Sequence, residues 1–75
     1  MPDHIIIMTS ITYVNKAKYL LSQNNIKSYV TKLQASWERR GCGYGLKVRD
    51  SYLKVSLSLL EKYMIRVVEV ITDDD

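Results

Sequence analysis

The residue best suited to covalent chemistry is Cys42, the only cysteine of this 75-residue chain. It lies in the run Arg39-Arg40-Gly41-Cys42-Gly43, which joins an adjacent pair of arginines to two of the three glycines. Cationic side chains stabilise the thiolate, which is the nucleophilic form of cysteine. Glycines permit a tight turn that would expose the sulfur to another molecule. The run therefore predicts a reactive thiol.

The same run has a plainer interpretation. A lone free cysteine often packs as a small apolar side chain whose sulfur does no chemistry. The glycines can serve only to make a turn, and the arginines can simply face water. Both interpretations stay open from the residues alone.

Residue counts narrow the chemistry further. A single cysteine excludes an internal disulfide and provides no resolving thiol. Because His4 is the only histidine, a Cys/His zinc site within one chain is excluded, and we predict no metal and no cofactor. No histidine lies near a serine or cysteine, so an independent hydrolase is the least favoured class. A carrier or a binding protein is favoured over an enzyme.

Composition predicts one small soluble domain. Hydrophobic residues make up 47% of the chain, and the formal net charge is +3. We expect a single domain over 1–72 and an acidic tail over 73–75. The apolar run Ile5-Ile6-Ile7-Met8 is too short for a signal peptide or a membrane span, so we expect a cytoplasmic protein without a membrane partner. A core of this size would gain stability from a second copy.

Hydrophobic periodicity divides the chain into alternating strands and helices. Continuous β-branched residues predict a central strand, alternation predicts half-buried strands, and three- and four-residue steps predict helices. Ser10 or Thr12 is expected to cap the first helix, and Asp50 or Ser51 the second. Residues 34–41 read as a loop. The predicted strands are 4–9, 26–33, 45–49 and 66–72, and the predicted helices are 11–24 and 51–63.

The segment 51–63 is the main ambiguity, because its apolar residues also alternate as in a strand. Its length, its Asp-Ser start and its Leu-Leu-Glu-Lys end favour a helix. In a helix, Tyr52, Val55 and Leu59 form a second apolar stripe beside the main one. That stripe is either part of a broad core face or a contact with another chain.

The resulting order, βαββαβ, predicts an α+β ferredoxin-like fold, with a four-stranded antiparallel sheet and both helices on one face. The loop before the third strand then lies at the same end of the sheet as the start of the first helix. Cys42 would sit beside Thr9, Ser10 and the unpaired N–H groups of that helix, which stabilise anions. The predicted site is therefore Cys42, supported by residues Arg39, Arg40, Gly41, Gly43, Thr9 and Ser10.

Several short motifs match a known family in sequence order. A Cys-Gly pair leads into an apolar strand, a Ser-containing turn enters the first helix, and an Asn-Ile pair ends that helix; these are Cys42-Gly43 with Leu46 and Val48, Met8-Thr9-Ser10 with Ala17, and Asn25-Ile26. On these residues the chain resembles, over nearly its whole length, the small bacterial selenium/sulfur carrier-like proteins of the DUF3343 type. It departs from their Pro-x-Pro-Arg run after the second strand, where it has Leu33-Gln34-Ala35-Ser36.

The resemblance implies a sulfur or selenium carrier. Cys42 would accept the atom from a donor protein as a persulfide or selenosulfide and pass it to an acceptor protein. The alternative is a non-catalytic protein-binding or dimeric assembly module of the same fold. RNA binding is disfavoured, because Tyr44 alone does not make the aromatic motif that such sheets use.

Overall fold

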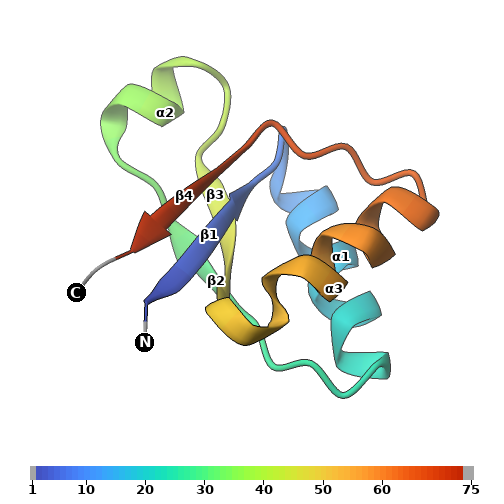
Figure 1. Ribbon diagram of the computed structural model, residues 1–75. Helices are drawn as coiled ribbons and strands as arrows, with labels where there is room; N and C mark the ends of the chain where they lie inside the picture. Colours follow the sequence, from blue (N-terminus) through green and yellow to red (C-terminus); the bar gives the residue numbers. More distant parts are fainter. Residues whose placement is uncertain (1, 74–75) are drawn as a thin grey trace.

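The computed structural model describes residues 2–73. Within them the chain forms four strands and three helices (Figure 1). In chain order these are β1 (Asp3–Ile7), α1 (Ile11–Gln23), β2 (Tyr29–Lys32), α2 (Ala35–Arg39), β3 (Tyr44–Arg49), α3 (Asp50–Lys62) and β4 (Glu69–Asp73).

The strands form one antiparallel sheet in the order β2-β3-β1-β4. The inner position of β1 agrees with its Ile-Ile-Ile segment, because Ile6 packs in the main core while Ile5 and Ile7 belong to a second, smaller apolar cluster. Ile6 pairs with Leu46 on one side and with Val70 on the other. The structure is thus α+β with an open four-stranded antiparallel sheet, which is compatible with a ferredoxin-like fold.

The main core lies between the sheet and the two long helices, which stand together beside it in Figure 1. Ile6, Leu46 and Val48 contribute from the strands, while Val14 and Leu60 contribute from α1 and α3. All five side chains are buried. The prediction that 51–63 is helical is confirmed, since α3 spans Asp50–Lys62.

The helix starts agree only in part with the predicted caps. Ser10 is the N-cap of α1, and its hydroxyl accepts a hydrogen bond of 3.3 Å from the backbone N–H of Tyr13. For α3 the cap position falls on Arg49, which makes no side-chain capping bond. The expectation that Asp50 or Ser51 caps this helix is therefore wrong. Asp50 instead binds His4 of β1, at 2.5 Å between Oδ1 and Nε2.

Two further expectations need correction. The segment predicted as a loop contains α2, a helix of five residues that lies apart from α1 and α3 (Figure 1). Asp73, assigned to the acidic tail, is the last residue of β4, and its carboxylate lies 2.7 Å from the ammonium of Lys47. The rest of the predicted tail, 74–75, lies outside the described residues.

Candidate functional site

Cys42 is buried, with 4% of its surface exposed, so the expectation of an exposed thiol is wrong. Its side chain belongs to a second, smaller apolar cluster with Ile7 and Leu33. Trp37 packs against that cluster from α2. Ile7 alternates with Ile6 and Met8, which belong to the main core, so the small cluster lies on the opposite face of the sheet from α1.

The backbone around Cys42 shows why the side chain turns inward. Arg40 is the C-cap of α2, and Gly41 follows with a φ of 86°, in the left-handed region that glycine adopts without strain. The N–H of Gly41 donates to the carbonyl of Glu38 at 3.0 Å, and the N–H of Cys42 donates to that of Trp37 at 2.9 Å. This pair of bonds is a Schellman motif, in which the residue after the left-handed position commonly makes an apolar contact back to the helix.

The other two helices end in the same motif. After α1, Asn25 is left-handed, and the N–H of Ile26 donates to Leu21 at 2.9 Å. After α3, Met64 is left-handed, and the N–H of Ile65 donates to Leu60 at 2.8 Å. Ile26 and Ile65 hold the position that Cys42 holds after α2, and each is 4% exposed, as Cys42 is. Cys42 is therefore the apolar anchor of a helix end, equivalent in place to two isoleucines.

The predicted supporting residues do not gather around the sulfur as one site. The guanidinium of Arg40 stacks on the ring of Trp37, 4.4 Å from its centroid, while Arg39 is exposed. Thr9 is exposed, and Ser10 uses its hydroxyl to cap α1. Gly43 has open space where a Cβ would lie.

In residues 2–73 no three His, Cys, Asp or Glu side chains are grouped so that they could hold a metal ion. None of the helices described there has the length and apolar character needed to cross a bilayer.

The face of the sheet that α1 and α3 leave open is a poor apolar contact surface. One end is covered by Leu33 and by Trp37 of α2. The other end is ionic, because Lys47 lies 2.7 Å from the carboxylate of Asp73 and 4.0 Å from that of Asp3. In β2, Val30 packs on the main core, whereas Tyr29 does not and faces this open side of the sheet.

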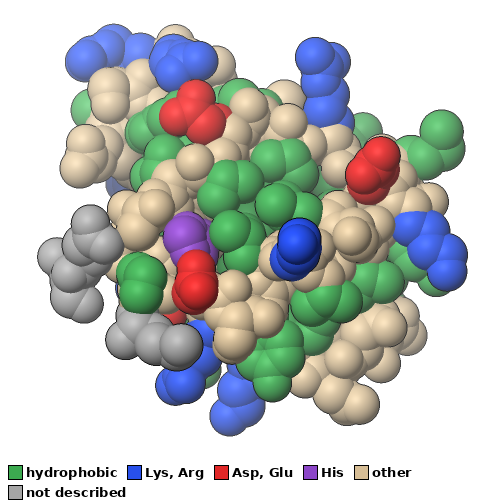
Figure 2. All heavy atoms as spheres, in the orientation of Figure 1, with side chains coloured by type: hydrophobic (Ala, Val, Ile, Leu, Met, Phe, Trp, Pro, Cys, Tyr) green, Lys and Arg blue, Asp and Glu red, His purple; other side chains and the backbone are tan. Residues whose placement is uncertain are grey.

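The most exposed apolar side chain of the described residues lies elsewhere, where α3 leads into β4. Met64 is 90% exposed, although its φ of 61° is a backbone conformation that favours glycine or asparagine. It borders a groove of about 520 Å³ that is lined by Leu57, Glu61, Met64, Ile65, Arg66 and Val67. Figure 2 shows hydrophobic side chains gathered on the face that carries α3 and β4. We call this feature the α3–β4 groove.

The charges of the α3–β4 groove are one acid and one base. Neither the carboxylate of Glu61 nor the guanidinium of Arg66 forms an ion pair with another described residue. The groove thus combines an apolar floor with two unpaired charges of opposite sign. The sequence patterns described above do not predict this groove. The available signal was Met64 itself, since the helix lacks the usual Gly or Asn after its last residue.

The second stripe of α3 is more exposed than a core face would be. Tyr52 and Val55 are exposed, and Leu59 is half-buried against the main core. Only Ser56 and Leu60 of this helix are fully buried. Of the two interpretations of the stripe, the exposed side chains favour a contact surface.

Comparisons with protein-family models, with curated proteins and with solved structures gave no match to this chain. The resemblance to selenium/sulfur carrier-like proteins stays a prediction.

Proposed function

We propose that this protein is a non-catalytic assembly module with a ferredoxin-like fold, and that it acts by pairing with a second copy of itself through the α3–β4 groove. The observation that carries the proposal is Met64, a large apolar side chain that is 90% exposed beside an apolar groove. The left-handed backbone at Met64 costs free energy that a glycine would not cost. A contact made by the methionine side chain would offset that cost.

A second copy suits the groove because its charges are self-complementary. In a two-fold symmetric pair, the same patch faces itself, so a contact of residue i with residue j occurs twice. Glu61 of each copy can then face Arg66 of the other, with the two Met64 side chains between the apolar floors. The flexible methionine side chain adapts well to such an irregular surface.

A charge exchange tests the pairing. The wild-type protein is expected to show a dimer by light scattering after size exclusion, and E61R or R66E alone should weaken the dimer by placing like charges opposite each other. The double variant E61R/R66E should restore it. K32E, on β2 at the opposite edge of the sheet from β4, is the control and should leave the dimer unchanged. A monomer at all concentrations, or a double variant no better than the singles, would contradict the proposal.

The carrier function is a second candidate, and one observation favours it. The cover over Cys42 is thin, since no residue of α2 is buried and both Gly41 and Gly43 have open space around them. If α2 opened, the thiolate of Cys42 could attack the outer sulfur of a donor persulfide. The donor S–S bond would break, the donor thiolate would leave, and Cys42 would keep the outer sulfur as a persulfide. A cytoplasmic location, which would suit this chemistry, stays a prediction.

Mass spectrometry distinguishes the two candidates. After incubation with a cysteine desulfurase and cysteine, a carrier gains the mass of one sulfur atom on Cys42, whereas an assembly module does not. C42V serves as the control, because it keeps an apolar side chain at the helix end and has no sulfur. If the wild-type protein gains sulfur on Cys42 to the same extent as a known carrier, the carrier function replaces the assembly function as the proposal.

A further inference from the structure

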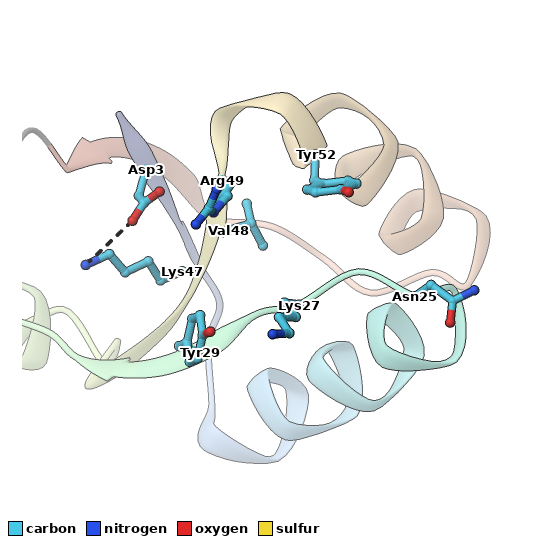
Figure 3. Close-up of a pocket in the computed structure, with 8 residues that line it drawn as sticks. All are labelled: Asp3, Asn25, Lys27, Tyr29, Lys47, Val48, Arg49 and Tyr52. Atoms are coloured by element: carbon cyan, nitrogen blue, oxygen red, sulfur yellow. Dashed lines mark ion pairs between the residues drawn. The ribbon is translucent and has the colours of Figure 1, made fainter. Parts of the chain in front are cut away.

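A polar cavity lies away from the α3–β4 groove, at the edge where β2 leaves β3. It has a volume of about 500 Å³, which lies within the range of small-molecule sites. Figure 3 shows its two sides. Lys27 and Tyr29 lie on one side, while Val48, Arg49 and Tyr52 lie on the other, from β3 and α3.

Two cations of this cavity have no acidic partner among the residues that the structure describes. Lys27 and Arg49 form no ion pair with any described residue, whereas Lys47, which also lines the cavity, is held by Asp73 and Asp3. Asp3 is a carboxylate at the rim, and its contact with Lys47 lowers its repulsion of an anion. The cavity is therefore net positive and favours an anionic ligand.

The start of α3 adds to this preference. Arg49 is the N-cap of that helix and gives no side-chain hydrogen bond to its first turn. The N–H of Asp50 donates to the carbonyl of Pro2 at 3.3 Å, so only the backbone donors after it are left for solvent or a ligand. The carboxylate of Asp50 is turned to His4 of β1. Tyr52, in the same first turn, lines the cavity.

Aromatic side chains define the rest of the ligand. Tyr29 and Tyr52 are both exposed, and neither phenol oxygen makes a hydrogen bond within residues 2–73. Tyrosine rings stack on planar heterocycles, and the hydroxyls can bond to their polar edges. Val48 provides a buried apolar wall between them.

The geometry points to a binding site for a phosphorylated planar metabolite of mononucleotide size. Lys27 and Arg49 bind the phosphate, which carries close to two negative charges as a monoester. Tyr29 and Tyr52 hold the planar group. This site shares no lining residue with the α3–β4 groove proposed for dimer formation, so each proposal can be tested without the other.

Amide chemical-shift titrations test the site with four probes: AMP, adenosine, inorganic phosphate and a short single-stranded RNA. AMP should give saturable shifts in 25–29 and 47–52, and should bind more tightly than adenosine or phosphate alone. K27Q and R49Q should each weaken AMP binding on the order of 10-fold, as expected for loss of a charge-assisted bond. K62Q, at the far end of α3, is the charge-matched control and should leave AMP binding unchanged.

Several outcomes would overturn the inference. Phosphate that binds as tightly as AMP would remove the role of the tyrosines. RNA that binds far more tightly than AMP would make the site a segment of a nucleic-acid surface. Shifts outside the cavity, or binding unaffected by K27Q and R49Q, would reject the site itself. The spectra of the variants also report whether they fold.

Discussion

The backbone N–H of Cys42 donates a hydrogen bond of 2.9 Å to the carbonyl of Trp37, and both side chains take part in the same apolar cluster. The cysteine and the tryptophan thus close the end of α2 together. The role of Cys42 in this position is to pack against the apolar cluster, and α2, the helix that it terminates, covers its sulfur.

Cys42 should react slowly with a water-soluble thiol reagent in the native protein. Reaction requires local opening of α2 or global unfolding, so labelling should be at least about 100-fold slower than in denaturant. C42V should keep the free energy of unfolding within about 1 kcal/mol, and C42S should lower it by about 1–3 kcal/mol, because it buries a hydroxyl without a partner. Native labelling as fast as in the unfolded chain would show that the sulfur is accessible.

Gly45 should be intolerant of a side chain. A Cβ at this position would lie 2.6 Å from Cγ2 of Ile5 and 3.2 Å from the carbonyl oxygen of Ile6. We expect G45A to lower the free energy of unfolding by about 1–3 kcal/mol, measured by urea denaturation. G43A is the matched control, since no atom lies within 4 Å of a Cβ there. Equal effects of the two variants would show that packing is not the cause.

Replacing Met64 by glycine should have opposite effects on the stability of the monomer and on the formation of the dimer. Because its φ of 61° is unfavourable for a side chain, M64G should raise the stability of the monomer by up to about 1 kcal/mol. The same variant should weaken the dimer, because it removes the exposed methionine. Y63G is the control, since Tyr63 has a φ of −96° and glycine there should only destabilise. Denaturation at low concentration and light scattering at high concentration separate the two effects.

Ser56 should be replaceable by alanine with a gain in stability. Its hydroxyl is fully buried and has no hydrogen-bond partner within the described chain. S56A removes the unpaired polar atom and raises helix propensity, so we expect a gain of about 1 kcal/mol in thermal or urea unfolding. S58A, on the exposed surface of α3, isolates the propensity effect. A loss of stability in S56A would mean that the hydroxyl is bonded in solution.

The hydrophobic pattern predicted the order and type of the main helices and strands, because the apolar runs and stripes that define them extend over several residues. The Ile5–Met8 run and the stripe of α1 led to the correct element types, and β3 and α3 also fell close to their predicted bounds. The strands were predicted one to three residues too long at several ends, because apolar residues such as Ile26 and Leu33 continue past the ladders as loop anchors. Periodicity does not distinguish an anchor from a strand residue.

The site was harder to predict because it depended on one turn. The prediction placed Cys42 at the correct end of the sheet, since Gly45 pairs with Ile7 of β1. It is wrong about the exposure of the sulfur, because the segment 34–41, predicted as a loop, contains α2, and Gly41 terminates that helix. Arg-Gly followed by an apolar residue is itself a signal for a helix end. This signal at Gly41 predicts that the side chain of Cys42 points into the protein.

The central position of β1 also bears on how the chain folds. Its partners, β3 and β4, begin at Tyr44 and Glu69, so each ladder closes a long loop and the fold has many contacts between residues far apart in sequence. Such topologies fold slowly. Until both partners have been synthesised, the Ile-Ile-Ile segment has two unpaired edges and is the part of the chain most exposed to aggregation or to chaperone binding.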